Sequence, residues 1–394
     1  MSLVFHKPQK DHIEIIGSIA DQHMDSAARA DEQNELNYAL IEDLLSAGYH
    51  TYSVPKEYGG LGVSLSDFLQ CQERIAMVDA ATALAIGWHH ITVFNVGQNQ
   101  LWDEAAFHAL CRAVVSEGAL VNAADSEKAT GSPSRGGKPQ TSAEKTSDGN
   151  GYVLTGRKTF TSLSTALHYY VVSATDTVTG EVGEHLVHKD NPGVSIEPTW
   201  NMTGMRGTAS HDLVLNQVQL PENALVRRRP AGKKSIRPNA YLLNIPAVYL
   251  GIAQGARREA LRFAAAYQPN SLTQPIIELP HIQHKIGQLE MELTTARHFL
   301  YSVAARWEQL ERPLTDSDLA RIAPDLGAAK TFAVQNALSI VDTAMRIVGV
   351  HSLASSHPLS RMYRDVRFGL HNPPMDDAVY QMLANRAISE VPLS

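Results

Sequence analysis

Cysteine is scarce in this sequence, and neither sign of charge is in strong excess. Only Cys71 and Cys111 occur among 394 residues, which is too few for a framework of several disulfides and is typical of a reducing compartment. We therefore expect a cytoplasmic protein. The 34 Lys and Arg residues against 41 Asp and Glu residues leave a net charge of −7, so no overall positive field attracts nucleic acid or an anionic membrane.

Long apolar runs are also absent. The N-terminal segment carries Lys7, Lys10, Asp11 and Glu14, which excludes the apolar stretch of a signal peptide. No later window approaches the roughly 18 consecutive apolar residues of a membrane-spanning helix. We expect neither export nor a membrane span.

Several catalytic motifs are missing as well. The chain has no G-x-G-x-x-G after a strand, no G-x-x-x-x-G-K-[ST], no G-x-S-x-G and no H-E-x-x-H, so Rossmann, P-loop, hydrolase and zinc-protease functions lack their signatures. His89 and His90 are adjacent, and neighbours on a helix diverge by about 100°, so they do not readily share one metal ion. We expect no metal site.

The residue pattern that is present divides the chain into three parts. In the first third, apolar residues recur at spacings of three and four, and Ser64 precedes a stripe of Phe68, Cys71 and Ile75, so we expect Ser64 to cap a helix. From about residue 120, short β-branched and aromatic runs replace this pattern, and long helical periods return later. The predicted fold is mostly α with a central β domain. It comprises an N-terminal helical domain at 1–118, a small antiparallel β-barrel in a middle domain at 119–232 and a C-terminal four-helix bundle at 233–394.

Four local stretches point to a known family. They lie at Pro55–Gly62 (P-K-E-Y-G-G-L-G), Gly156–Ser162 (G-R-K-T-F-T-S), Gly204–Asp212 (G-M-R-G-T-A-S-H-D) and Arg346–Arg367, which ends in R-M-Y-R-D-V-R. Together they resemble the acyl-CoA dehydrogenase superfamily of flavoproteins, and the second stretch is the most specific match. The resemblance implies α,β-dehydrogenation of an acyl-CoA thioester, with hydride transfer to flavin N5 and electron transfer to an acceptor flavoprotein.

The resemblance also implies the residues of an FAD site. Phe160 matches the aromatic residue beside the isoalloxazine, Ser162 the hydroxyl residue at flavin N5, and Ser126 a residue at the pyrimidine edge. An aromatic ring offers stacking area, and a hydroxyl can donate to N5 or accept from a reduced N5–H. Gln283 and Gly349 match positions that approach the dinucleotide of the neighbouring subunit, so we expect a homotetramer or homodimer.

The catalytic carboxylate of the family has no match at either of its usual positions. One position falls on Pro373 and the other on Tyr241. Removal of the α-proton of a thioester still requires a positioned general base. Allowing a small local shift, we expect Asp376 or Asp377 to be that base.

Two alternative functions remain open at this point. Arg364 and Arg367 followed by His371 resemble the C-terminal pattern of two-component flavin monooxygenases, which use oxygen and reduced flavin, FMN in this case, from a flavin reductase. His371 would then be catalytic, because a neutral imidazole can take a proton near pH 7, and His89 or His90 resembles a second histidine of that group. The other alternative is a catalytically silent flavin-fold protein that binds a partner or ligand.

Overall fold

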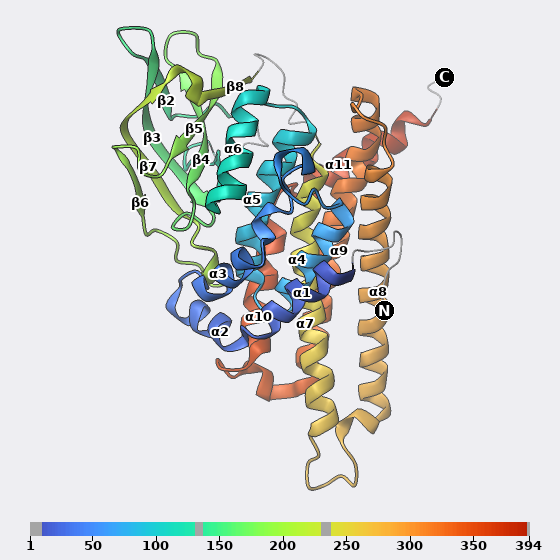
Figure 1. The fold of residues 1–394 in the computed structure, drawn as a ribbon. Helices are drawn as coiled ribbons and strands as arrows, with labels where there is room; N and C mark the ends of the chain where they lie inside the picture. The colour runs from blue at the N-terminus through green and yellow to red at the C-terminus, as the bar shows by residue number, and fades with distance from the viewer. Residues whose placement is uncertain (1–9, 131–136, 230–237, 392–394) are drawn as a thin grey trace.

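The computed structural model describes residues 10–130, 137–229 and 238–391. It contains an N-terminal group of helices, a β-sheet domain beside them and a group of long C-terminal helices (Figure 1). This arrangement confirms the mostly α fold with a central β domain. The predicted domain boundary between residues 232 and 233 lies outside the described residues.

The N-terminal helices begin at well-formed caps. They are α1 (Lys10–Asp21), α2 (Met24–Gln33), α3 (Tyr38–Ser46), α4 (Leu65–Ala76), α5 (Ala80–Gln98) and α6 (Glu104–Glu117). Asn37, Ser64, Asp79 and Asp103 each accept a hydrogen bond from the backbone N–H three residues later, which satisfies a donor that the first turn leaves unpaired. Ser64 therefore caps α4 as predicted. Helix α5 is apolar on most sides because it is buried in the centre of the molecule.

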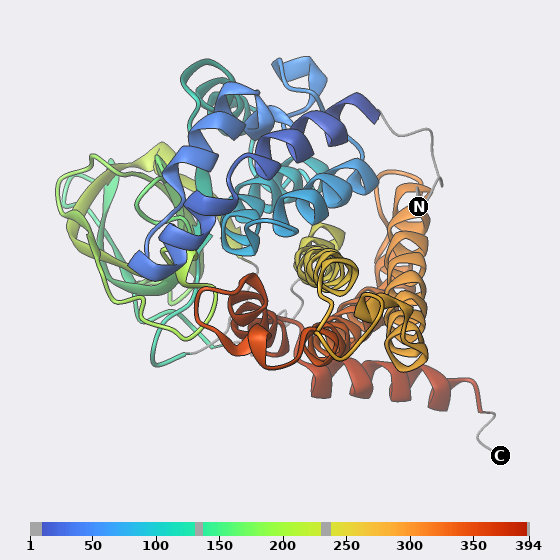
Figure 2. The same cartoon turned by 90° about the horizontal axis from the view of Figure 1, so that it is seen from below.

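The middle of the chain forms one curved sheet (Figure 2). Its strands are β1 (Val121–Ala124), β2 (Ser142–Lys145), β3 (Gly151–Thr161), β4 (Tyr169–Asp176), β5 (Val182–His188), β6 (Val194–Glu197), β7 (His211–Pro221) and β8 (Leu225–Arg229). They follow the order β6-β7-β3-β2-β4-β5-β8, and β1 also pairs with β4. The sheet is mixed rather than antiparallel, because β4 runs parallel to both β1 and β2. Among the described strands no pairing joins β6 to β8, so the expected closed barrel is not observed.

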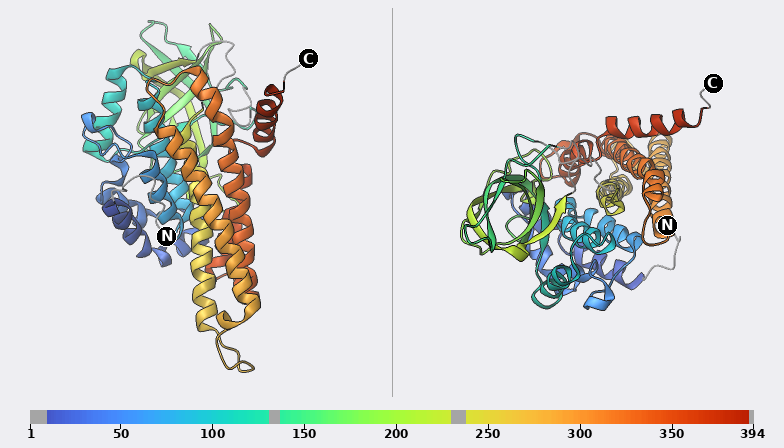
Figure 3. Two further views of the ribbon diagram at one scale, coloured as in Figure 1. Left: turned by 90° about the vertical axis from the view of Figure 1, so that its right-hand side faces the viewer. Right: turned by 90° about the horizontal axis from the view of Figure 1, so that it is seen from above.

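Three long helices dominate the C-terminal part. They are α7 (Asn244–Ala266), α8 (Pro280–Glu308) and α9 (Asp316–Val348), followed by the shorter α10 (Pro358–Val366) and α11 (Asp376–Ser389). The long helices extend together away from the sheet, as the left view of Figure 3 shows. Helix α9 packs against α7, α8, α10 and α11, while α4 of the N-terminal group also packs against α7. The predicted bundle is therefore continuous with the N-terminal helices.

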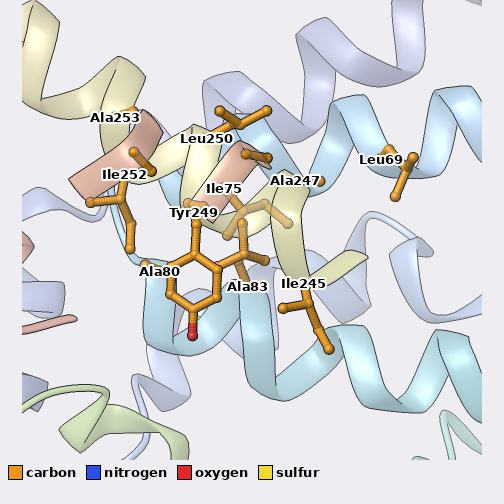
Figure 4. Close-up of a cluster of buried hydrophobic side chains, with 14 of the residues drawn as sticks. Leu69, Ile75, Ala80, Ala83, Ile245, Ala247, Tyr249, Leu250, Ile252 and Ala253 are labelled. Atoms are coloured by element: carbon orange, nitrogen blue, oxygen red, sulfur yellow. The ribbon is translucent and has the colours of Figure 1, made fainter. Parts of the chain in front are cut away.

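A shared apolar core joins these two helical parts. Figure 4 shows side chains of α4, α5 and α7 converging around Tyr249. Two glycines of α7 permit this close packing: a Cβ at Gly251 would lie 2.6 Å from the Glu73 carbonyl oxygen, and one at Gly255 would lie 2.6 Å from that of Met77. The sheet encloses a second core of its own. None of the helices in the described part of the chain is long and apolar enough to cross a membrane.

Candidate functional site

Several residues with an unusual backbone conformation lie in the β domain where β3 ends and β7 begins. The two strands pair there, with Thr161 opposite His211. Phe160, Leu163, Met205 and Ala209, all in or beside this region, have positive φ angles between 42° and 65°, a conformation that side chains other than glycine adopt rarely and at a cost. Phe160 keeps 59 % of its surface exposed despite its size. A strained backbone that presents a bare aromatic ring is typical of a ligand-binding surface.

A chain of buried hydroxyl groups lies next to that ring. The Ser162 and Ser210 hydroxyl oxygens are 2.8 Å apart, and Ser210 is also 2.8 Å from the Thr208 hydroxyl. Thr208 in turn donates to the Met205 carbonyl oxygen at 2.9 Å. The Asn122 side chain donates to the Ser162 carbonyl oxygen at 3.0 Å and fixes the backbone of that residue. Ser162, predicted from the sequence, thus belongs to a larger polar set, whose members Thr208 and Ser210 lie in the Gly204–Asp212 motif but whose contact with Ser162 the sequence did not indicate.

An aromatic series connects Phe160 to the C-terminal part of the chain. The Trp200 ring centroid lies 6.0 Å from that of Phe160 and 5.8 Å from that of Phe368. The Trp200 indole N–H donates to the Met205 carbonyl oxygen at 3.0 Å, which fixes the ring. Sequence reasoning missed both Trp200 and Phe368. The one available signal was the position of Trp200, four residues before the Gly204 motif.

The loop that carries Trp200 is held by residues of both helical parts. The Arg206 guanidinium donates to the Asp31 carbonyl oxygen at 2.7 Å, and Arg364 donates to the Asp31 carboxylate and to the Thr203 carbonyl oxygen. The Met205 backbone N–H donates to Asp365 at 2.5 Å. Burial raises the pKa of the Asp365 carboxyl to about 6, although Arg361 opposes that effect. The loop is therefore fixed at the junction of three parts of the molecule.

Ser126 lies beside β3, just before a buried ion pair. Its carbonyl oxygen accepts from the Thr159 backbone N–H at 2.8 Å. The next residue, Glu127, contacts the Lys158 ammonium at 2.6 Å and also accepts from the Thr141 hydroxyl. Burial acts to raise the pKa of Glu127, but the bonds from Lys158 and Thr141 outweigh it and leave that pKa lowered. This network attaches the Ser126 segment to the strand that carries Phe160.

The segment with the predicted catalytic residues follows Phe368. His371 is exposed at the end of a short 3-10 helix, and the next residue, Asn372, accepts from the buried Tyr249 hydroxyl at 2.5 Å. Asp376 accepts from the Thr331 hydroxyl at 2.9 Å and from the Lys330 ammonium at 3.2 Å, so its partners lie on α9. Asp377 is exposed and accepts from the Ala378 N–H at 2.9 Å.

The second family position for a carboxylate is occupied by an aromatic stack. The rings of Tyr241 and Phe94 lie 4.2 Å apart and nearly parallel, and burial raises the pKa of the Tyr241 phenol. No carboxylate stands at this position or at Pro373.

His89 and His90 are core residues of the N-terminal helices. The His89 Nε2 lies 2.9 Å from the His50 carbonyl oxygen, while its Nδ1 accepts from the Val121 N–H, so the ring is neutral with its proton on Nε2. Burial lowers the pKa of His89 to about 4. The His90 Nδ1 is 3.0 Å from the Ser53 hydroxyl. Within the described ranges, no group of three or more metal-ligating side chains converges.

Gln283 and Gly349 lie at one end of the long helices. Gln283 is exposed in the first turn of α8, and Gly349 ends α9 with a φ of 72°. A cavity of about 520 Å³ between these helices is lined by Lys285, Arg346 and His281, and also by Asp342, which pairs with Arg346 at 2.7 Å. Neither predicted residue lines the cavity, but Gln283 is next to the lining residue His284, and Gly349 follows Arg346 by three residues.

Comparison with known proteins identifies relatives over most of the chain. Three family models match: the acyl-CoA dehydrogenase N-terminal domain at residues 9–100, the middle domain at 122–218 and the C-terminal domain at 243–372. The protein YdbM of Bacillus subtilis strain 168, a candidate acyl-CoA dehydrogenase by name, is 48 % identical over 380 residues, which cover 96 % of this chain and 97 % of YdbM.

Two solved structures show the same fold. Butyryl-CoA dehydrogenase from Megasphaera elsdenii superposes with a TM-score of 0.86 at 20 % identity, covering 98 % of this chain and all of that one. TdsC from Paenibacillus sp. A11-2, in complex with FMN and indole, superposes with a TM-score of 0.85 at 21 % identity, covering 97 % of this chain and 98 % of that one. At these identities the likeness establishes the architecture.

Proposed function

The chain belongs to the acyl-CoA dehydrogenase family, and from that premise we propose that it is a flavin-dependent oxidoreductase that dehydrogenates an acyl-CoA thioester between its α and β carbons. The observation that carries the proposal is the exposed Phe160 ring beside the buried Ser162 hydroxyl. A stacking surface and a single hydrogen-bonding group at its edge suit a planar, polar-edged cofactor. The 48 % identity to YdbM supports the dehydrogenase assignment.

The proposed cofactor is FAD. Phe160, Ser162 and Ser126 would hold the flavin ring, while Gln283 and Gly349 of a neighbouring subunit would contact the dinucleotide. Lys285 in the cavity near Gln283 supports this arrangement, because a Lys ammonium suits phosphate oxygens, while Arg346 in the same cavity is paired with Asp342. When bound, the flavin supplies a hydride acceptor at N5. The arrangement requires a homotetramer or homodimer, which light scattering at micromolar concentration tests: a monomer would contradict it.

The proposed base is one of two neighbouring aspartates. A base that takes the α-proton must have a carboxylate oxygen free to receive it. Asp376 is engaged by Lys330 and Thr331, whereas Asp377 accepts only from a backbone N–H among its described contacts. These contacts favour Asp377 as the base and Asp376 as its support. An acceptor flavoprotein would then take the electrons, and the scarcity of thiols supports a cytoplasmic location.

A second candidate function is a flavin monooxygenase that uses reduced FMN and oxygen. The observation that favours it is the absence of a carboxylate at Pro373 and Tyr241. His371 would then hold or move a proton, and a flavin reductase would be the partner. TdsC, which shares the fold, was solved with FMN, the cofactor that this alternative requires.

Anaerobic stopped-flow mixing of the flavin-loaded protein with a panel of acyl-CoA thioesters tests the proposal. Loss of the oxidised-flavin absorbance supports dehydrogenation, and we expect Asp377→Asn to abolish it while His371→Gln retains it. No loss with any thioester, combined with oxygen consumption by the reduced protein that releases little hydrogen peroxide and that His371→Gln slows, would favour the monooxygenase instead. A sample that is yellow but inert in both assays, or colourless, would indicate a silent binding protein.

A further inference from the structure

The hydroxyl chain at Ser162 has a defined direction. A hydroxyl group has one proton to donate and two lone pairs that accept. Thr208 lies 2.9 Å from the Met205 carbonyl oxygen, which can only accept and which also accepts from the Trp200 indole N–H. When the Thr208 proton makes that bond, the proton between Ser210 and Thr208 comes from Ser210, and the proton between Ser162 and Ser210 comes from Ser162.

The consequence is that Ser162 presents lone pairs, rather than a proton, to any further partner. Ser162, Ser210 and Thr208 are at least nine-tenths buried, so water does not readily replace a lost partner within the chain. To donate outward, Ser162 would either break its bond to Ser210 or reverse all three hydroxyl groups, in which case Thr208 would give up its bond to the Met205 carbonyl.

Building on the proposed flavin site, we infer that Ser210 and Thr208 are positioning residues that make the site selective for reduced flavin. Reduced flavin carries an N5–H that Ser162 can accept while every bond of the chain is kept. Oxidised flavin offers only an acceptor at N5, and satisfying it costs one bond of the chain, either that between Ser162 and Ser210 or that from Thr208 to Met205. The difference is one hydrogen bond, which corresponds to a two- to ten-fold tighter binding of the reduced form, or about 10–30 mV in the two-electron potential.

The reduction potential of the bound flavin tests this inference. We would measure it anaerobically by dye equilibration for the wild type, Ser210→Ala and Thr208→Val, each loaded with FAD and with FMN. In Ser210→Ala the Ser162 hydroxyl turns freely, so the potential should fall by about 10–30 mV. In the isosteric Thr208→Val, Ser210 has only Ser162 to donate to, and the potential should fall at least as far.

Ser164→Ala is the matched control. Ser164 is also buried, lies two residues from Ser162 and donates to a backbone carbonyl, that of Ala209, at 2.7 Å, but it is outside the chain. The reduction potential of flavin bound to Ser164→Ala should equal that of flavin bound to the wild type.

Each result bears on the inference in a different way. An unchanged or raised potential in both Ser210→Ala and Thr208→Val would overturn it while leaving the flavin site intact. An equal fall in Ser164→Ala would also overturn it, by indicating a general structural effect. Failure of the wild type to bind FAD or FMN would overturn the proposed function and this inference together.

Discussion

Asp365→Asn should make the protein more stable at neutral pH. The Asp365 carboxyl is buried and accepts from the Met205 N–H, and burial raises its pKa from 3.8 to about 6 despite the opposing charge of Arg361. The folded protein therefore holds this proton more tightly than the unfolded chain does. Between about pH 4 and pH 6 the folded state binds more protons, so stability falls as pH rises through that window, and the full cost is present above it.

The expected gain in stability of Asp365→Asn follows from the raised pKa of Asp365. A pKa difference of about two units corresponds to about 3 kcal/mol between the two protonation states. An asparagine is neutral at every pH and its side-chain oxygen still accepts from Met205, so we expect a gain of about 1–3 kcal/mol at pH 7.5. The gain should vanish below about pH 4.

Urea denaturation from pH 4 to pH 8 measures how the unfolding free energy depends on pH. The protein concentration is kept constant, because the apparent stability of an oligomer changes with concentration. Asp325→Asn is the control of opposite sign. Burial acts to raise the pKa of Asp325, but its bonds from Arg386 and Arg306 outweigh it and lower that pKa, so this variant should lose stability at pH 7.5 and lose less on acidification. A pH-independent gain in Asp365→Asn, or a loss at pH 7.5, would refute the reasoning.

Three further substitutions probe the contacts that hold the site. Lys158→Met leaves the buried Glu127 carboxylate without its cation and should cost about 3–5 kcal/mol of unfolding free energy; a cost below 1 kcal/mol in urea titration would argue against a rigid pair. Tyr249→Phe removes the donor to Asn372 and should cost about 1–3 kcal/mol, with faster hydrogen exchange in the following segment, and unchanged exchange there would contradict the proposed anchor. Leu250→Ala empties a fully buried position in the core of Figure 4 and should cost about 2–5 kcal/mol, whereas a neutral thermal melt would mean that the core refills.

The fold was predictable to the extent that local pattern determines it. The stripe of Phe68, Cys71 and Ile75 is buried on a helix that Ser64 caps, because helical spacing and a capping side chain act within a few residues. The directions of the strands were not predictable in this way. Short β-branched and aromatic runs in β1 and β4 indicate strands, but nothing in them specifies that the two pair in parallel across about 45 residues of chain.

The same limit applies to the candidate site. Phe160 and Ser162 follow from a short motif, whereas the contact of Trp200 with Phe368 joins segments separated by more than 160 residues. The Thr208 and Ser210 hydroxyl groups were visible in the sequence, but their alignment with Ser162 depends on the pairing of β3 with β7. Long-range geometry of this kind arises from tertiary packing rather than from local periodicity.

The packing of residues 368–377 limits which of their side chains can transfer a proton. Phe368 contacts Trp200. At the next residue, Gly369, there is no room for a side chain, because a Cβ would lie 2.7 Å from Val334. Asp376 is bound by Lys330 of α9. A segment fixed at these points does not shift freely along its length, so a proton-transfer group in it, which the proposed function requires, would be one that the segment already presents. The exposed residues His371 and Asp377 meet that condition, and they correspond to the two candidate reactions. Comparing Asp377→Asn with His371→Gln therefore tests the chemistry itself, because both changes leave the anchors of the segment in place.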